Sequence, residues 1–246
     1  LDGNGQDDFV KILAGVQEAH GGITEILDNN ENFVKYNSLD NAKNNGISFV
    51  SGDRKKEGIL PNLSIYENLV VPLYKKTSRG GFLGFVDWLE LNGIFDWEVD
   101  RLSIKTGPRD NLIGSLSGGN QQKVMIARSF AQHPKVLILN DPARGIDVST
   151  KRDLYTHLRN YVEEGNTVVF LSSELEEFIG LCPKVMVFRN GTVFDIFENE
   201  KVNADTLLEG MFGQTAGIGE TTISSKSNTP LMPTPNRKID NNIPEK

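Results

Sequence analysis

The sequence predicts an α/β fold in which buried parallel strands alternate with helices. Three short, continuous apolar runs, at residues 136–139, 168–171 and 185–188, have the length and composition of strands. Such runs are typical of parallel sheets, because helices cover both faces of the sheet and bury every side chain. Two further short strands are expected, at residues 23–27 and 47–50.

Segments with helical spacing of apolar residues lie between and around these runs. Asn190 and Gly191 predict a tight hairpin turn, because both residue types readily adopt positive φ. That turn joins the run at residues 185–189 to a further strand expected at residues 192–197. The expected helices cover residues 9–16, 65–69, 82–91, the stretch from the glycines at 118–119 to about 131, and residues 152–163.

The composition excludes several classes of protein. A net charge of −7 over 246 residues argues against a general binder of nucleic-acid phosphates, since such proteins are usually basic. The single cysteine, Cys182, can form no internal disulfide and is expected to be a small buried residue. No apolar run approaches the roughly 20 residues that cross a bilayer. Contact with a membrane is therefore expected to pass through a partner protein.

The strongest chemical signal is the segment LSGGNQQK, in which Ser117, Gly118 and Gly119 stand at an expected helix start. A serine and two glycines at that position expose several backbone N–H groups, and the helix dipole adds partial positive charge. With Asn120, the segment suits a terminal phosphate. Taken alone, Ser-Gly-Gly is more often a glycine-rich turn capped by its serine, so the surrounding pattern has to decide.

Polar residues follow two of the apolar strands. The run at residues 136–139 ends in Asn140 and Asp141. Acidic or amide side chains at such a strand end hold Mg²⁺ and orient the attacking water in P-loop ATPases. Asp147 closes a tight loop a few residues later, and Ser173 follows the next strand. These four residues are therefore candidates for nucleotide chemistry.

In this order and spacing the motifs resemble those of the ABC ATPase family. Residues 116–120 match its signature motif, LSGGQ, and residues 139–141 stand at the end of its Walker B strand. Asp147 stands in its D-loop and Ser173 at its switch position. Upstream, the glycine-rich residues 3–5 precede a helix, as the family's phosphate-cradling loop does.

The resemblance covers residues 1–213 and implies a P-loop (RecA-like) ABC nucleotide-binding domain with an inserted helical subdomain. It places the core at about residues 1–52 and 132–200, and the helical subdomain at about 53–131. Residues 214–246 are rich in Ser, Thr, Asn and Pro and contain few large apolar residues, so we expect a disordered tail.

The segment ISFVSGDRKKEG, at residues 47–58, is similar to one in the second half of ATPase subunits of monosaccharide importers (ribose, galactose and xylose type). The resemblance implies ATP and Mg²⁺ as cofactors, and a place at the cytoplasmic face of a bacterial inner membrane. The implied partners are the first ATPase half of the same subunit, membrane-spanning permease subunits and, indirectly, a periplasmic sugar-binding protein. Nucleic acid is not among them. Some nucleoside importers have similar subunits, so both substrate classes stay open.

The expected phosphate loop departs from the working pattern GxxGxGKS. The match begins at the second glycine, Gly3, so we expect the chain to be an N-terminally truncated piece of a longer protein. Asn4 and Gly5 complete the loop. Gln6 stands where lysine belongs and supplies a dipole in place of a full positive charge. Asp7 stands where Ser or Thr belongs, and its carboxylate repels phosphates unless a metal intervenes.

The catalytic positions of the family also differ here. Asn140 replaces the Mg²⁺-binding aspartate, so Asn140 and Asp7 are weak metal candidates at best. Asp141 replaces the catalytic glutamate, Ser173 the switch histidine, and Gly52 the Q-loop glutamine. Loss of one positioned charge or donor in phosphoryl transfer costs on the order of 10²- to 10⁵-fold in rate. We therefore expect the chain's own site to hydrolyse ATP poorly or not at all.

The signature, in contrast, is intact. The resemblance implies that Ser117, Gly118 and Gly119 contact the γ-phosphate of ATP held by the first half of the subunit, and that Asp147 couples the two sites. Two rivals stay open. A non-transport ABC protein acting on ribosomes or DNA is disfavoured by the acidic charge. A non-catalytic regulatory or scaffolding module is favoured by the degenerate loop.

Overall fold

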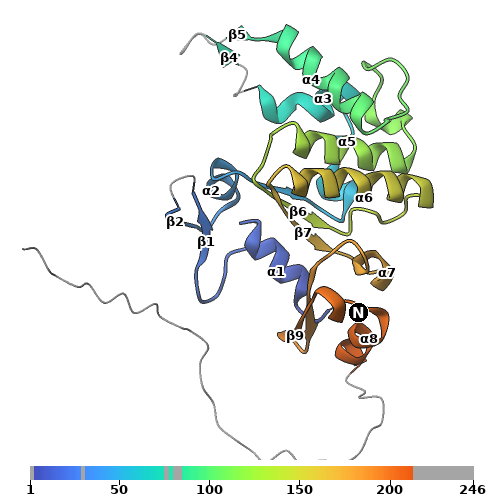
Figure 1. The fold of residues 1–246 in the computed structure, drawn as a ribbon. Helices are drawn as coiled ribbons and strands as arrows, with labels where there is room; N and C mark the ends of the chain where they lie inside the picture. Colours follow the sequence, from blue (N-terminus) through green and yellow to red (C-terminus); the bar gives the residue numbers. More distant parts are fainter. Residues whose placement is uncertain (1–2, 29–30, 75–77, 80–84, 213–246) are drawn as a thin grey trace, which may run out of the picture. The chain divides into compact units, whose positions relative to one another are not determined.

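The centre of the fold is a three-stranded parallel sheet. A computed structural model describes residues 3–28, 31–74, 78–79 and 85–212 (Figure 1). The sheet has the order β3-β6-β7, and its strands are Ile47–Val50, Val136–Asn140 and Thr167–Leu171. All three are strands that the sequence predicts, and their parallel pairing confirms the α/β class. The tail expected at residues 214–246 lies outside the described residues.

Helices cover both faces of this sheet. Side chains alternate between the two faces along each strand, so a continuously apolar strand presents apolar side chains to helices on both sides. On one face, Leu137 packs with α5 (Gly118–Phe130) and α6 (Val148–Glu163) in a hydrophobic cluster, here called the α5–α6 cluster. On the opposite face, Ile138 packs with α1 (Gln6–Leu13) in a second cluster, the α1 cluster. Neighbouring residues of one strand thus serve two separate parts of the core.

A layer of helices lies on the α5–α6 face. Helix α3 (Ile65–Val70) packs against α5 and against α4 (Trp88–Arg101). A capping box fixes the start of α3: the Ser64 hydroxyl accepts from the Glu67 N–H at 3.1 Å, and the Glu67 carboxylate accepts from the Ser64 N–H at 2.8 Å. The short helix expected near residues 65–69 is therefore confirmed.

The helix expected at residues 82–91 is wrong in its bounds from residue 85 on, and residues 82–84 lie outside the described residues. Phe85–Val86 forms β5, which pairs with β4 (Ser78–Arg79). The helix begins only at Trp88, because the Asp87 carboxylate accepts a hydrogen bond from the Glu90 N–H and caps it there. It then continues to Arg101, one residue before the buried Leu102.

A β-hairpin joins β8 (Lys184–Arg189) to β9 (Thr192–Glu198). Its turn uses Asn190 and Gly191, with φ of +50° and +77°. The hairpin confirms the turn prediction and corrects another: the apolar run at residues 185–188 is not a strand of the parallel sheet. The turn returns the chain at once, so β8 pairs antiparallel with β9.

The segment after α1 also differs from expectation. The helix ends at Leu13 and not near Val16, whose side chain is 46% exposed. Gly15, with φ of +69°, turns the chain there. The expected strand at residues 23–27 is β1 (Thr24–Leu27), which forms a hairpin with β2 (Phe33–Tyr36).

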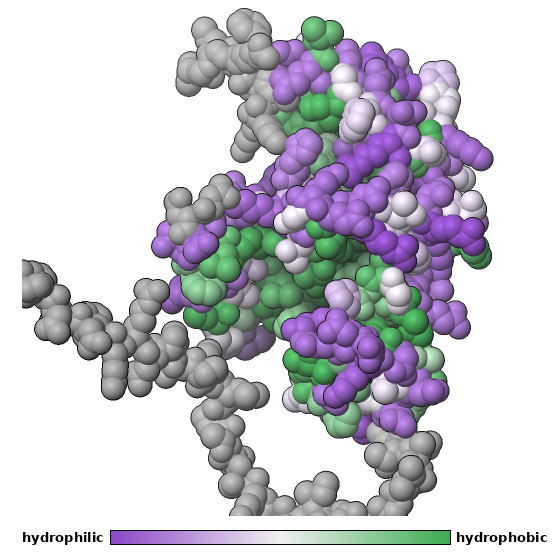
Figure 2. Space-filling model, viewed as in Figure 1, coloured by the Kyte–Doolittle hydropathy of each residue, from purple (hydrophilic) through white to green (hydrophobic). Residues whose placement is uncertain are grey.

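The outer edge of β7 has no strand partner within the described residues. Beside it lies a cavity of about 570 Å³, lined mainly by apolar residues of β7, β8, α1 and α6. Figure 2 shows hydrophobic residues gathered between the part of the chain that carries α5 and α6 and the part that carries β9 and α8. The apolar residues of β7 are consequently only half-buried.

The remaining elements are short, except for α8. Among the described residues, no helix is both long and apolar enough to cross a membrane. The further elements are α2 (Leu39–Asn44), a π-helical turn (Arg54–Gly58), α7 (Leu175–Phe178), α8 (Ala204–Phe212) and the 3₁₀ turns Val71–Leu73, Ile113–Ser115 and Asn199–Lys201.

Candidate functional site

The loop before α1, where a phosphate-binding turn is expected, contains two glycines with positive φ. Gly3 and Gly5 have φ of +84° and +94°, a left-handed conformation that glycine adopts without strain. Gly5 is the N-cap of α1, where no side chain caps the helix. A Cβ on Gly5 would lie 3.2 Å from the Cα of Gly191, so the loop packs against the β8–β9 turn. Both its conformation and its packing therefore require glycine at this position.

Asp7 is the most strongly paired side chain of this loop region. Its Oδ1 accepts a hydrogen bond from Asn140 Nδ2 at 2.6 Å, and its Oδ2 lies 2.6 Å from Lys11 Nζ. Burial acts to raise the pKa of Asp7, but the Lys11 and Asn140 contacts outweigh it, and the pKa is lowered. Asp7 is therefore a carboxylate whose two oxygens both have partners.

Gln6 and Asn4 close the loop on itself and on the neighbouring turn. The Asn4 N–H donates to Gln6 Oε1 at 3.1 Å. In the other direction, Asn4 Oδ1 accepts from the Asn190 N–H at 3.1 Å, and the Asn4 carbonyl accepts from the Gly191 N–H at 3.2 Å. Asn4 therefore ties α1 to the β8–β9 hairpin.

The structure brings Asp141 and Ser173 together at the carboxyl ends of β6 and β7. Ser173 Oγ donates to Asp141 Oδ2 at 3.2 Å, and the Asp141 N–H donates to the Leu171 carbonyl at 2.7 Å. Asp141 has a φ of +47°, a left-handed conformation that is uncommon for residues other than glycine. Burial raises the pKa of Asp141, and the hydrogen bond from Ser173 only partly offsets this.

Gly52 packs directly on Asn140. A Cβ at residue 52 would lie 3.1 Å from the Asn140 carbonyl oxygen and 3.4 Å from its Oδ1. Asn140 itself is 9% exposed. Asn140 thus occupies the space that a side chain at residue 52 would need.

These contacts do not suit a resident Mg²⁺ with a nucleotide triphosphate. Asn140 directs its amide N–H to Asp7, so Nδ2 offers no ligand to a cation and only its amide oxygen could bind one. No group of three or more His, Cys, Asp or Glu side chains within the described ranges could hold a metal ion. The expected lysine charge is absent at Gln6, and the nearest cation, Lys11, is paired with Asp7.

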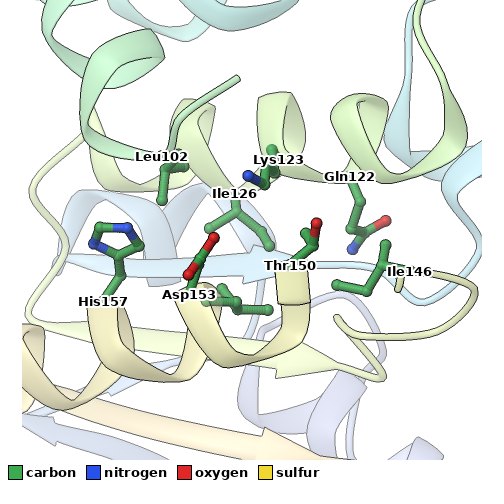
Figure 3. A pocket seen from close by; sticks show the side chains of 9 residues that line it. Leu102, Gln122, Lys123, Ile126, Ile146, Thr150, Asp153 and His157 are labelled. Carbon is green, nitrogen blue, oxygen red and sulfur yellow. The ribbon is translucent and has the colours of Figure 1, made fainter. Parts of the chain in front are cut away.

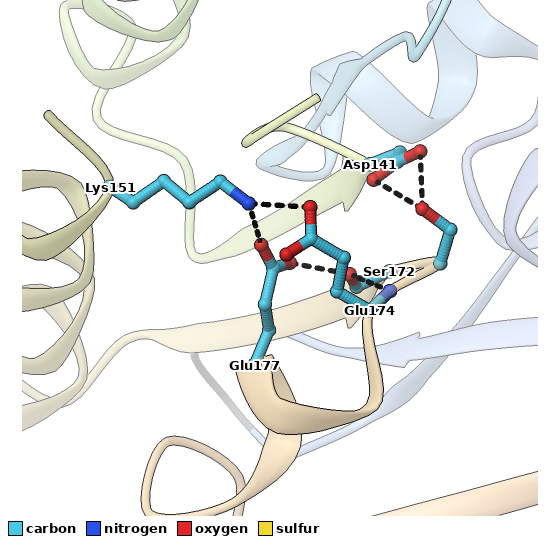
Figure 4. Close-up of polar contacts among 6 residues, drawn as sticks. Asp141, Lys151, Ser172, Glu174 and Glu177 are labelled. Atoms are coloured by element: carbon cyan, nitrogen blue, oxygen red, sulfur yellow. Dashed lines mark hydrogen bonds and ion pairs between the residues drawn. The ribbon is translucent and has the colours of Figure 1, made fainter. Parts of the chain in front are cut away.

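A second polar cluster lies beside Asp141 and Ser173, and Figure 4 shows its contacts. Lys151 Nζ, from α6, lies 2.5 Å from Glu174 Oε1 and 2.9 Å from Glu177 Oε1. Burial lowers the pKa of Lys151, but the two carboxylates outweigh this and raise it. Ser172 Oγ donates to the other oxygen of Glu177 and accepts from the Glu174 N–H at 2.9 Å. The cluster fixes α6 to the segment that follows β7.

The signature residues form an ordered, partly exposed helix start. Ser117 is the N-cap of α5, and its hydroxyl accepts from the Asn120 N–H at 3.4 Å and from Asn120 Nδ2 at 3.0 Å. Asn120 Oδ1 accepts from the Lys105 N–H at 2.9 Å. Arg54 Nη1 donates to the Gly118 carbonyl at 3.0 Å. Two distant segments, at Arg54 and at Lys105, thus contact the first turn of α5.

Asp147 lies close to the signature. It is the N-cap of α6 and accepts from the Thr150 N–H at 3.0 Å, which lowers the pKa of its carboxyl. Ile146, the residue before it, lies beside Gly119, whose Cβ would meet Ile146 at 3.6 Å. Figure 3 shows Ile146 and Thr150 facing Gln122 across a cavity of about 10 Å³ between α5 and α6. A cavity of that size holds one water at most, so the two helices pack closely.

The comparison with protein families decides the identity. The family model described as "ABC transporter" matches residues 2–144, more than half of the chain. The chain belongs to the ABC transporter family. The matched region contains the phosphate loop, the signature and the end of β6. The resemblance of these motifs to the ABC ATPase family is confirmed.

Curated relatives of this ABC transporter chain are named ribose import ATP-binding protein RbsA. The protein from Roseobacter denitrificans is 33% identical over 213 residues, which are 87% of this chain and 40% of that protein. The protein from Bacillus cereus is 35% identical over 209 residues, which are 85% of this chain and 41% of that protein. The chain therefore spans about two fifths of the length of these relatives.

Solved structures confirm the ABC ATPase fold. A dimeric bacterial ABC transporter cassette, MJ0796, matches with a TM-score of 0.69 and 21% identity over 80% of this chain and 82% of the other. The same cassette bound to ADP and Pi matches with a TM-score of 0.67 and 22% identity over the same shares. At such identities the likeness concerns the fold alone.

Three contacts around the candidate site are not predicted from the sequence, those of Lys11, Lys151 and Arg54. The pair of Lys11 and Asp7 has a signal, since opposite charges four residues apart meet on a helix. Lys151 and Arg54 have none, because their partners are distant in sequence. Within the described residues, no hydrogen bond or ion pair joins the signature residues to Asp7, so the structure presents them as two separate sets.

Proposed function

We propose that the chain is the second ATP-binding half of a bacterial sugar-importer ATPase subunit, at the cytoplasmic face of the inner membrane. The names of its relatives support sugar import, ribose in particular. The chain spans about two fifths of their length, which leaves room for another ATP-binding half. The segment at residues 47–58 supports assignment to the second half. A nucleoside importer is the nearest alternative substrate class.

The geometry of the signature carries this proposal. Ser117 caps α5, and the next two residues are glycines, so residues 118 and 119 bring no side chain of their own to the first turn; Arg54 contacts it at the Gly118 carbonyl. The first amides of a helix lack partners within the helix, and the dipole makes that end attractive to phosphate. Ser117 is exposed, so the first turn of α5 is open to another domain.

In the proposed complex, Ser117, Gly118 and Gly119 donate to the terminal phosphate of ATP held by the first half of the subunit. Asp147 reaches the same interface, because its neighbour Ile146 packs beside Gly119. Closure then moves α5 and α6 together, and the helical subdomain, at about residues 53–131, passes the motion to membrane-spanning permease subunits. A periplasmic sugar-binding protein delivers the sugar on the opposite side of the membrane.

The chain's own site is proposed to contribute little hydrolysis. Gln6, Asp7 and Asn140 each remove charge or metal affinity from it, and Asp141 and Ser173 replace longer or more basic groups. Each such loss costs on the order of 10²-fold or more. Disabling the Walker lysine of the other half in the complete importer should therefore bring ATP turnover to background. Near-normal turnover in that variant would refute this part of the proposal.

Substitution of Gly119 tests the signature directly. A Cβ there meets Ile146 at an ordinary 3.6 Å, so Gly119→Ala should fold normally while placing a methyl group at the phosphate-facing turn. ATP turnover of the complete importer should fall on the order of 10²-fold, as for loss of a positioned donor. Gly114→Ala is the matched control, because no atom lies within 4 Å of its Cβ. Equal turnover in both variants would contradict the proposal.

The second candidate is a non-catalytic regulatory or scaffolding half. The pairing of Asp7 with Lys11 and Asn140 favours it, because those contacts leave the loop no free cation for phosphate. The same Gly119→Ala measurement separates the candidates. A scaffold tolerates the methyl group without loss of turnover, whereas a signature that completes the partner's site does not.

A further inference from the structure

The residues that replace lysine and hydroxyl in the phosphate loop make contacts of their own. Asp7 receives a hydrogen bond from Asn140 on one oxygen and an ion pair from Lys11 on the other, each at 2.6 Å. We propose that this Lys11–Asp7–Asn140 brace holds α1 to the end of β6 in place of metal and phosphate, and that the loop takes up no nucleotide. The proposal rests on the proposed function only in identifying this loop as the chain's own ATP site.

The brace spans two elements that the core joins only through the α1 cluster. Asp7 lies in the first turn of α1, Lys11 one turn later, and Asn140 at the last position of β6. Asn140 is 9% exposed, so its contact with Asp7 is shielded on the strand side, whereas the side chains of Lys11 and Asp7 are 29% and 50% exposed and their ion pair is partly open to water. Since the amide of Asn140 donates to the carboxylate, the gap between helix and strand closes without an ion.

The loop before α1 is likewise held by hydrogen bonds between protein groups. In a phosphate-binding turn the backbone N–H groups point toward an anion. Here the Asn4 N–H donates to Gln6 Oε1, so the side chain at the lysine position supplies the acceptor. The carbonyl and side chain of Asn4 are engaged by the turn at Asn190 and Gly191. The loop keeps its conformation through protein groups alone.

The charge around the loop opposes a nucleotide. Asp7 and Asp8 both lie in the first turn of α1, where carboxylates interact favourably with the helix dipole. They therefore take the electrostatic role that a bound phosphate has at other helix starts. Among the described residues of this loop and of α1, the basic side chain is Lys11, and Asp7 compensates its charge.

Calorimetric titration of the complete 246-residue chain with MgATP tests the binding claim. The parent chain should give no saturable heat. A variant with Gln6→Lys, Asp7→Ser and Asn140→Asp restores the working residues and should bind MgATP, with slower amide hydrogen exchange in α1 once bound. Lys11→Met should raise exchange in α1 several-fold and gain no binding. Asp8→Ser is the matched control for Asp7→Ser, because it removes one negative charge from the same first turn of α1. It should leave the amide exchange of α1 as in the parent chain.

Saturable binding of MgATP to the parent chain would overturn the proposal. So would unchanged exchange of α1 in Lys11→Met, because the brace would then hold nothing. Failure of the proposed function has a different signature, namely full ATP turnover of the complete importer after Gly119→Ala. The two results are independent, since Gly119 makes no contact with the brace among the described residues.

Discussion

Glu98 is a buried carboxyl that makes the stability of the fold depend on pH. It lies on α4 with 1% of its surface exposed, and its Oε2 has no hydrogen-bond partner within the described part of the chain. Arg101 Nη1 lies 3.6 Å from the other oxygen. Burial raises the pKa of Glu98 to about 7, against an ordinary 4.5, and the charge of Arg101 only partly opposes this.

The raised pKa fixes both the sign and the size of the effect. Between pH 4.5 and 7 the folded chain keeps a proton on Glu98 that the unfolded chain releases. The free energy of unfolding therefore falls as pH rises through this window, by about 3 kcal/mol at 1.36 kcal/mol for each pKa unit. Glu98→Gln removes the titration and keeps the shape. At pH 5 the substitution should hardly change the free energy of unfolding. At pH 8 it should raise that free energy by roughly 2 kcal/mol, less than the full value of about 3 kcal/mol because Arg101 loses its charged partner.

Urea unfolding at pH 5 and at pH 8 measures this difference. The control is Asp96→Asn, which removes an exposed carboxyl from the same helix and should shift stability by no more than about 0.5 kcal/mol at either pH. The unfolding free energy of Glu98→Gln minus that of the parent chain should be larger at pH 8 than at pH 5. If this difference is the same at both pH values, the reasoning is refuted. Glu98 would then be ionised in the folded state without cost.

Two further substitutions probe the packing around the sites. Gly15→Ala should destabilise the fold on the order of 2 kcal/mol or more, because its φ is +69° and a Cβ would lie 2.5 Å from the Ser38 carbonyl; thermal unfolding checks this. Lys151→Met should cost roughly 3 kcal/mol in urea unfolding, because Glu177 is left buried without its cation. Lys184→Met, which breaks an exposed pair, should cost under about 1 kcal/mol, and equal losses would contradict the argument.

The sequence predicts the sheet better than its surroundings. The strands of the parallel sheet are apolar on both faces, and that pattern survives because α1 and the α5–α6 pair cover the two faces. The run at residues 185–188 has the same composition, yet the turn at Asn190 and Gly191 overrides it and makes a hairpin. Strand β2 and helix α2 leave no clear pattern, because Phe33 and Leu39 expose large apolar side chains.

The sequence also predicts some parts of the candidate site better than others. Motif order places Asp141 and Ser173 each after an apolar strand, and because those strands are parallel neighbours their carboxyl ends meet at one edge, where Ser173 Oγ donates to Asp141. The sequence also shows which charges are missing from the phosphate loop, but not what replaces them. The contact between Asp7 and Asn140 crosses 133 positions of sequence and depends on how α1 packs on β6. Only the folded chain can bring these two residues together.

The division of the core explains how one site can lose its residues while the other keeps them. The signature turn begins α5, whose buried residues belong to the α5–α6 cluster, and Ile146 packs against that same cluster. The phosphate loop begins α1, whose buried residues belong to the α1 cluster on the opposite face of the sheet. Gln6 and Asp7, which stand where the family has lysine and a hydroxyl residue, make their contacts on the α1 side. Ser117 makes its contacts on the other side. In the proposed arrangement, the brace can therefore close the loop while the signature stays ordered, because the two lie on opposite faces of the sheet.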